Sequence, residues 1–229
     1  MGNLSILAIS LLNLQLFSLQ FYFLYAFILV KLNIGGLNEM KERKGFFEVH
    51  HQRDALTCGN ACLLMMLRDL TRTPFDLERL QRELYMESYG VYPGYYPLKV
   101  AATFVRHFPN TRLTFYTDTR TQHNLTRSYN EERQIELVYQ PLTVDWIVNH
   151  TQTVGPLAIR GDYFYLGYAE HTDHFITLIR EPKHRLVVLD PSYGGKMSLD
   201  DEKLTHYLSG YKYIMNASPL AIAMNVDLI

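Results

Sequence analysis

Hydrophobic and polar positions divide the chain into a helical first part and a strand-rich last part. Residues 61–67 form an almost unbroken apolar run of strong helix formers, which predicts a helix that begins near Cys58 and ends near Thr71. The pair Thr73-Pro74 then supplies a cap and a proline for the first turn of a second helix, and Pro97 begins a third. The first part of the domain is therefore expected to be helical.

The last part of the chain carries shorter apolar and β-branched runs that Pro and Gly turns separate. Three of these runs predict strands at 156–162, 175–180 and 186–190. A helix at 199–208 and a further strand at 211–215 follow. Helices first and an antiparallel sheet second is the α+β arrangement, and we expect that fold class.

Between these two parts the pattern is weaker. The tract 89–96 contains Gly, Pro and four tyrosines and predicts a loop that covers the core or lines a groove. A strand is expected at 113–116 and a short helix at 144–148. The polar run 117–134 has little to bury, so we expect a solvated insertion there.

The first 30 residues differ from the rest of the chain, because they contain no charged side chain and are mostly apolar. Such a segment is long enough to cross a bilayer. The basic residues near it all follow it, and the positive-inside rule then places the rest of the chain in the cytoplasm: Lys31, Lys41, Arg43 and Lys44. We therefore expect a single-pass membrane protein with a cytoplasmic C-terminal domain.

This pattern predicts three parts, namely a hydrophobic anchor at 1–31, a polar linker at 32–45 and one domain at 46–229. A cleaved signal peptide fits less well, since a basic start and a small-residue cleavage site are not evident. The alternative is that translation starts at Met40, which immediately precedes the globular part.

The composition of the chain argues against several classes of protein function. The chain has 229 residues and a formal net charge of −1, with no Lys/Arg cluster beyond 41–44, so the electrostatic signature of a nucleic-acid-binding protein is missing. Its two cysteines lie four residues apart and have no second pair, which argues against a disulfide framework and a zinc site. We expect no cofactor.

Cys58 has two interpretations. At the start of an apolar helix, unpaired backbone N–H groups and the helix dipole favour an anion, which suits a thiolate nucleophile. A free cysteine is also among the most buried residue types, and Cys58 considered alone is better explained as a small core residue. That second interpretation fits Cys62 more strongly, because it lies one turn further along the same apolar helix.

Residues far from Cys58 in the sequence favour the interpretation of Cys58 as a nucleophile. Cysteine hydrolases need a base near the thiol, a group that orients the base and a donor for the oxyanion. His174 opens one predicted strand and Asp190 closes the next, and the short connection 181–184 would pair the two strands antiparallel, with the start of one beside the end of the other. Gln52, six residues before Cys58, can supply a side-chain N–H to the oxyanion together with the Cys58 backbone.

In these residues the chain resembles the papain-like cysteine peptidases that remove double-glycine leader peptides from bacteriocins and related peptides. Three blocks carry the resemblance, in the order expected for that family: Gln52 followed by Cys58-Gly59-Asn60-Ala61-Cys62-Leu63, then His174-Phe175-Ile176-Thr177-Leu178 with Asp190-Pro191-Ser192-Tyr193-Gly194, then an acidic helix from Leu199 to a Ser209-Gly210 turn. The resemblance spans 49–215.

The resemblance implies a papain-like fold and a cysteine peptidase in which Cys58 is the nucleophile, His174 the general base and acid, Asp190 the orienting group and Gln52 the oxyanion donor. It also implies a peptide or protein substrate, cleaved after small residues such as Gly-Gly, and a transporter as a possible partner. The chain departs from the family in Thr57, where an acidic residue is common, and in a longer, tyrosine-rich middle. Both departures bear on the substrate more than on the chemistry.

Three alternatives remain open from the sequence. The same triad serves a deamidase or a transpeptidase, and a peptidase fold can hold peptides or a transporter without cutting them. His171 and Asp173, next to His174, can also be read as metal ligands with His50-His51, although loop imidazoles are usually only solvated. Asp173 is a poorer orienter than Asp190, because it lies on the opposite face of the strand from its neighbour His174.

Overall fold

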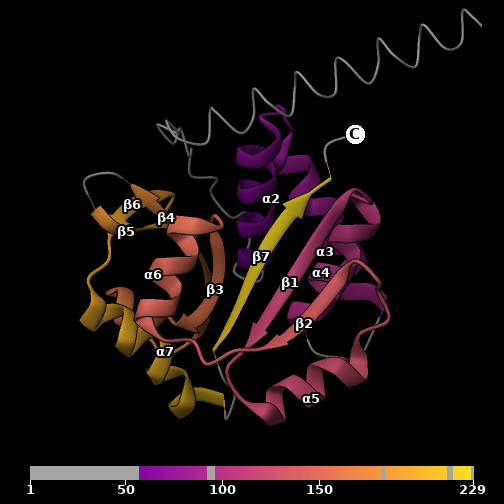
Figure 1. Ribbon diagram of the computed structural model, residues 1–229. Helices are drawn as coiled ribbons and strands as arrows, with labels where there is room; N and C mark the ends of the chain where they lie inside the picture. The colour runs from indigo at the N-terminus through magenta and orange to yellow at the C-terminus, as the bar shows by residue number, and fades with distance from the viewer. Residues whose placement is uncertain (1–56, 92–95, 182–183, 216–218, 228–229) are drawn as a thin grey trace, which may run out of the picture. The chain divides into compact units, whose positions relative to one another are not determined.

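Seven strands form one mixed, mostly antiparallel sheet in the part of the chain that the structure, a computed structural model, describes (Figure 1). The described residues are 57–91, 96–181, 184–215 and 219–227, and all of them belong to the unit Phe46–Leu228. The predicted anchor 1–31, the linker 32–45 and Gln52 lie outside them. Within the described residues, no helix has the length and apolar character needed to cross a membrane.

The strand order is β2-β1-β7-β3-β4-β5-β6, so the last strand of the chain lies in the middle of the sheet. Only β1 and β2 pair in parallel; the other neighbours pair antiparallel. The strands are β1 (Thr111–Thr117), β2 (Ile135–Tyr139), β3 (Leu157–Asp162), β4 (Asp173–Glu181), β5 (His184–Asp190), β6 (Gly195–Ser198) and β7 (Leu220–Val226).

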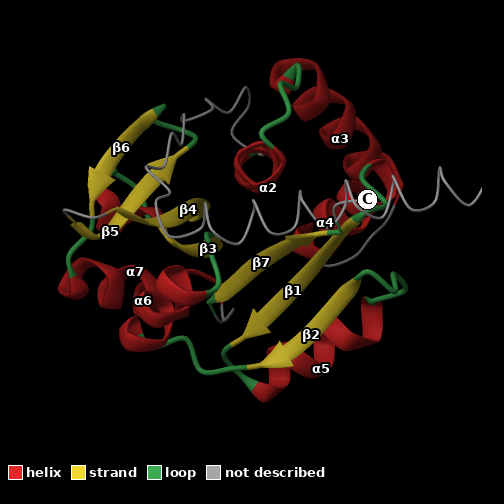
Figure 2. Cartoon of the chain, turned by 45° about the horizontal axis from the view of Figure 1, so that its top comes forward, coloured by secondary structure: helices red, strands yellow, loops and turns green. Residues whose placement is uncertain are grey.

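Helices cover both faces of this sheet, and each face has its own hydrophobic core. One core lies between the sheet and the three described helices that precede β1, and the other lies between the sheet and the helices that precede β3 and β7 (Figure 2). The described helices are α2 (Cys58–Thr71), α3 (Leu77–Val91), α4 (Tyr96–His107), α5 (Arg120–Tyr129), α6 (Val144–Thr153) and α7 (Asp201–Met215), with a short 3₁₀ helix η2 (Tyr163–Leu166) after β3. The mixture is the predicted α+β fold.

The helix α2 is the central element of the first core. Every residue from Cys58 to Leu67 is buried. A helix with apolar side chains on all sides must be covered by other elements on all sides, and this burial agrees with that requirement. It packs against β4, β7 and β3 on one side and against α3 and α4 on the other (Figure 2). The predicted bounds of this helix are confirmed, and they bring its first residue next to β4.

Two helix boundaries differ from the prediction. The second helix begins at Leu77 rather than at Pro74, because the Asp76 carboxylate accepts the backbone N–H of Arg79 at 3.1 Å and so caps the helix there. Part of the tract expected to be a loop is helical, since α3 continues to Val91 and α4 begins at Tyr96.

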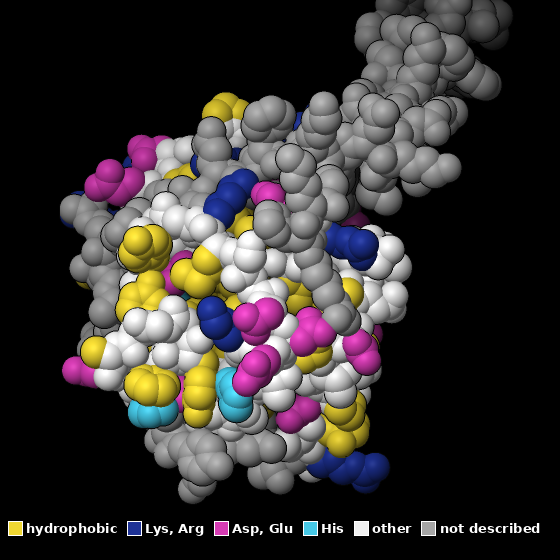
Figure 3. Space-filling model, turned by 90° about the vertical axis from the view of Figure 1, so that its left-hand side faces the viewer, with side chains coloured by type: hydrophobic (Ala, Val, Ile, Leu, Met, Phe, Trp, Pro, Cys, Tyr) yellow, Lys and Arg dark blue, Asp and Glu magenta, His cyan; other side chains and the backbone are white. Residues whose placement is uncertain are grey.

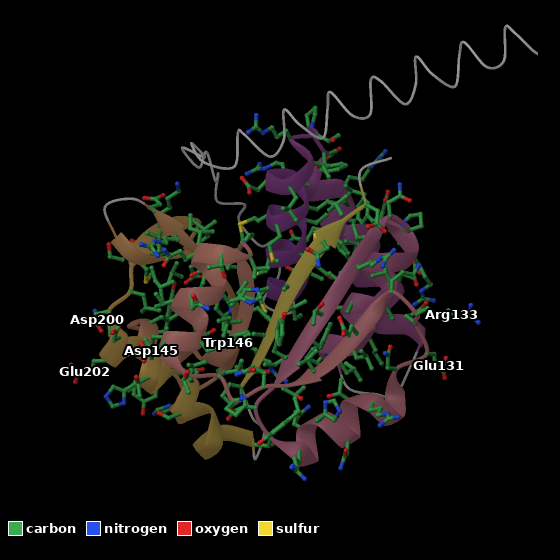
Figure 4. The ribbon with its side chains drawn as sticks, viewed as in Figure 1. Glu131, Arg133, Asp145, Trp146, Asp200 and Glu202 are labelled. Atoms are coloured by element: carbon green, nitrogen blue, oxygen red, sulfur yellow. The ribbon has the colours of Figure 1, made fainter. Side chains whose placement is uncertain are left out.

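The polar run 117–134 is not merely a solvated insertion. It contains α5, whose first turn is capped by Thr119 through the N–H of Gln122 at 3.1 Å. Gln122 and Thr126 of this helix are buried, and the Gln122 side-chain amide donates to the Thr126 hydroxyl at 3.3 Å, so the two polar side chains are partners for each other away from water. The turn that follows matches the prediction better, because Glu131 and Arg133 point outward there (Figure 4).

The C-terminal strand is in a different place from the one predicted. Residues 211–215 continue α7, which Asp200 caps by accepting the N–H of Lys203 at 2.7 Å, and the strand follows as β7. β7 is buried from Leu220 to Met224, which suits a strand between two neighbours with helices on both faces.

Candidate active site

Cys58 is the first residue of α2, where the backbone N–H groups of the first turn have no acceptor within the helix. Thr57 is the N-cap, but its side chain makes no capping hydrogen bond, and Gly59 lies inside the helix rather than in a turn before it. Cys58 is 6% exposed, whereas Cys62, one turn further on, is completely buried. The helix therefore places two thiols in different environments.

His174 and Asp190 face each other across neighbouring strands. His174 Nε2 and Asp190 Oδ1 are 2.9 Å apart, and both side chains are almost completely buried. The register explains this contact: Thr177 on β4 pairs with Leu189 on β5, so the start of β4 lies beside the end of β5. The hairpin arrangement expected from the sequence is therefore what the structure contains.

The Asp190 carboxylate accepts two further hydrogen bonds. The backbone N–H of Ser192 donates to Oδ1 at 2.8 Å, which forms an Asx turn. The Tyr168 hydroxyl donates to Oδ2 at 2.9 Å. Burial acts to raise the pKa of Asp190, but the hydrogen bonds and the charge of His174 outweigh it, so the pKa of this carboxyl is lowered. Asp190 is thus an anion fixed in one orientation.

His174 joins this carboxylate to the cysteine. Burial acts to lower the pKa of His174, but hydrogen bonds with Asp190 and Cys58, and the negative charge of both groups, raise it to about 9. Since Nε2 faces Asp190, Nδ1 is the ring nitrogen left for the thiol. His174 therefore interacts with both the Cys58 thiol and the Asp190 carboxylate.

Three titratable neighbours in this region each have a different partner. His171 Nδ1 lies 2.8 Å from Asp162, and Asp173 forms a short ion pair with Arg160, while His174 contacts Asp190. Asp173 is therefore engaged away from the histidine, as the strand alternation predicts. Among the described residues, no group of three or more His, Cys, Asp or Glu side chains is arranged to hold a metal ion.

Cys62 has the properties of a structural cysteine. Burial raises its pKa well above the ordinary value, although an interaction with the Thr177 hydroxyl acts in the opposite direction. A completely buried neutral thiol behaves as a small hydrophobic side chain. The prediction that Cys62 helps to fix the helix to the core agrees with this burial.

Two tyrosines from the β3–β4 loop, residues 163–172, lie over the histidine and the aspartate. The Tyr163 ring is 4.1 Å from the His174 ring, and Tyr168 stacks on Tyr163 at 3.4 Å. The Tyr163 hydroxyl is buried beside Ser192 and Tyr168, and burial raises its pKa. Neither tyrosine could be identified from the sequence, because an aromatic residue in a loop has no local signal that distinguishes it from an ordinary surface residue.

The outer side of the same loop faces away from the triad. Phe164 stacks on His171 at 4.1 Å, and Tyr165 stacks on His206 of α7 at 5.2 Å. Figure 3 shows histidine and hydrophobic side chains next to each other on this side of the molecule. The contact between Tyr165 and His206 ties the loop to α7.

Tyr207 supports the histidine from the other face of the sheet. This completely buried residue of α7 donates its hydroxyl to the backbone oxygen of His174 at 2.6 Å and lies 3.2 Å from that of Ile159. Its ring occupies the space beside Gly161, the β3 residue that pairs with His174. The sequence places Tyr207 in a predicted helix and Gly161 in a predicted strand, but no sequence pattern indicates that the two meet.

The described part of the site accounts for one of the two oxyanion donors expected from the sequence. The backbone N–H of Cys58 lies at the helix start, while Gln52 is outside the described residues. The structure thus brings Cys58, His174 and Asp190 together from α2, β4 and β5.

No known family model and no curated protein sequence matches this chain.

Proposed function

We propose that this protein is a cysteine peptidase that cleaves a peptide bond through a thioester on Cys58. The observation that carries the proposal is the hydrogen-bonded series from the Cys58 thiol through His174 to Asp190. These three groups are the nucleophile, base and orienter that acyl transfer needs. A purely structural histidine would not need a buried carboxylate on one nitrogen and a thiol at a helix start on the other.

The chemistry follows from this order of groups. His174 accepts the thiol proton through Nδ1, and the sulfur attacks the substrate carbonyl to form a tetrahedral oxyanion beside the Cys58 N–H. The imidazolium then returns the proton to the leaving amine as the C–N bond breaks, which leaves a thioester. Water, deprotonated by His174, attacks the thioester carbonyl and releases the acid and the thiol.

Several sequence features support a more specific proposal. The spacing of Gln52, Cys58, His174 and Asp190, and the Asp-Pro-x-x-Gly turn, resemble the papain-like peptidases of double-glycine leaders. On this basis the domain has a papain-like fold, Gln52 is the second oxyanion donor, and the substrate is a peptide cut after small residues. The uncharged residues 1–30 support anchoring at a membrane, and the partner class that we propose there is a transporter.

The experiment is to incubate the full chain with synthetic peptides that contain a Gly-Gly sequence after a leader-like segment, and to follow the products by mass spectrometry. We expect cleavage after Gly-Gly by the parent chain and by Cys62→Ala, and none by Cys58→Ala. A mass increase of one unit without chain cleavage would identify a deamidase, and a joined product would identify a transpeptidase. Retention of the peptides without any turnover would contradict the proposal and favour a binding module.

A further inference from the structure

We propose that Tyr168 is a positioning residue that limits how strongly Asp190 holds the protonated form of His174. The proposal rests on the function proposed above, because it assigns a role within the same triad. The two oxygens of the Asp190 carboxylate have different partners: His174 and the Ser192 N–H lie at Oδ1, whereas the Tyr168 hydroxyl donates to Oδ2 at 2.9 Å.

The two oxygens of a carboxylate share one charge, so a donor at one oxygen reduces the negative charge at the other. The Tyr168 hydroxyl at Oδ2 therefore weakens the attraction between Oδ1 and the imidazolium of His174. This matters for an acyl-transfer base, which must give its proton back to the leaving group. A carboxylate without the phenol would hold the imidazolium more tightly.

Tyr168 remains a donor throughout the working pH range. Burial raises the pKa of its phenol, and its interactions with Tyr163 and with the negative Asp190 raise it further. The proton of this hydroxyl therefore stays in place while His174 changes its charge. The phenol acts as a fixed dipole and not as a second titrating group.

The position of this phenol is also fixed. Its ring stacks on Tyr163 at 3.4 Å with an interplanar angle of 18°, and Tyr163 in turn packs on His174. The loop that carries both rings follows Asp162, the last residue of β3, whose completely buried carboxylate accepts the Phe164 N–H at 3.1 Å. Packing alone would account for an aromatic ring here, but not for the hydroxyl aimed at Asp190.

Among the described charged groups around His174, Asp190 is the partner of the Tyr168 hydroxyl, and the others have different partners. Asp190 and Cys58 contact it directly, while Asp173, its neighbour on β4, is paired with Arg160. On β3, which pairs with this strand, Asp162 lies with His171, and from α7 the Tyr207 hydroxyl meets the His174 backbone. Replacing the Tyr168 hydroxyl changes one donor on Asp190 and removes none of these charged groups.

The experiment measures the titration of His174 in the full chain by NMR, with ¹³C-labelled histidine and the His174 signal identified by its loss in His174→Gln. Tyr168→Phe is expected to move the midpoint of this titration to higher pH by about 0.5 unit. Incorporation of 3-fluorotyrosine at position 168, a stronger donor of nearly the same shape, is expected to move it to lower pH. Tyr165→Phe, in the same loop but stacked on His206, is the matched control and should leave it unchanged.

Opposite shifts for the two variants support the proposal, since a packing role would not depend on donor strength. An unchanged midpoint in both, or shifts in the same direction, would overturn it. Because fluorotyrosine retains the ring and the hydroxyl, the test survives a failure of Tyr168→Phe to fold. The titration is read without substrate, so a chain that cleaves nothing would overturn the proposed function and still report on Tyr168.

Discussion

The hydroxyl of Tyr207 on α7 lies 2.6 Å from the backbone oxygen of His174 on β4, and it connects the second core of the protein to the candidate base. Tyr207→Phe would remove a buried hydrogen bond and leave two backbone oxygens with one donor fewer. We expect it to lower the free energy of unfolding by about 1–3 kcal/mol and to reduce peptide cleavage. Urea denaturation with a cleavage assay measures both effects.

Tyr193→Phe is the control for this prediction, because its side chain is 70% exposed and its hydroxyl has little to lose. Its stability should stay within about 0.5 kcal/mol of the parent chain. A Tyr207→Phe protein as stable and active as Tyr193→Phe would show that the bond to His174 has no energetic role.

Gly161 is the strand residue that makes room for Tyr207. A Cβ at this position would overlap the buried Tyr207 ring, whereas a Cβ at Gly59 would meet Phe175 at 3.5 Å, an ordinary contact distance. Gly161→Ala is expected to cost about 1–3 kcal/mol of stability through overpacking. Gly59→Ala, in a helix, should leave stability unchanged or raise it by up to about 1 kcal/mol. Thermal or chemical denaturation of the two variants side by side checks the contrast, and equal effects would argue against the packing described here.

Asp190 and Asp173 allow the orienting role to be separated from general charge effects. Asp190→Asn would remove the anion that raises the pKa of His174, so this pKa should fall, and cleavage should drop by about 10²- to 10⁴-fold. Asp173→Asn breaks an ion pair with Arg160 and should leave both quantities close to those of the parent chain. NMR titration of His174 and cleavage rates provide the comparison. A larger loss of cleavage in Asp173→Asn than in Asp190→Asn would reverse the assignment of the orienter.

The rate of peptide cleavage should fall as the pH rises through about 9. The imidazolium of His174 must protonate the leaving amine, and this form is lost as the pH rises through its pKa of about 9. Rates of peptide cleavage across this range test the expectation. Cleavage that keeps rising well above pH 9 would be inconsistent with His174 as the acid.

The stability of the fold should change in the same range. Because the pKa of His174 is raised in the folded protein, its contribution to stability is complete below the unfolded value of 6.5 and is lost as the pH rises through about 9. The contribution of Asp190 to stability depends on pH in the opposite direction, because its pKa is lowered in the folded protein. This contribution is present above pH 3.8, the ordinary pKa of an aspartate, and declines as the pH falls below that value. Urea midpoints measured below pH 6.5 and above pH 9 should therefore differ more in the parent chain than in His174→Gln.

Much of the site could be predicted from sequence because it depends on strongly apolar elements. The run 61–67 identifies α2, and the runs around 175–180 and 186–190 identify β4 and β5, so the meeting of His174 and Asp190 follows from one hairpin. The strand β7 could not be placed, because its central position depends on partners on both sides rather than on a local signal. The helix α5 was not predicted because the run 117–134 is mostly polar, and two of the residues that the helix buries, Gln122 and Thr126, are polar.

The residues around the triad were beyond prediction for a different reason. Tyr168 lies 22 residues before Asp190 in a loop, and only the folded β3–β4 connection brings the two together. Alternation along a strand places Asp173 away from His174, but it does not reveal that Arg160 holds it. Contacts that arise from loop conformation leave no periodic pattern in the sequence.

The most direct test of the central claim compares the two cysteines within one molecule. Brief exposure of the full folded chain to iodoacetamide at neutral pH, followed by peptide mass spectrometry, measures the modification of Cys58 and Cys62 separately. We expect Cys58 to be modified rapidly, Cys62 to remain protected by its complete burial, and the Cys58 rate to fall at least about 10-fold in His174→Gln. If Cys58 reacts as slowly as Cys62, or at the same rate with and without His174, the protein does not use Cys58 as a nucleophile.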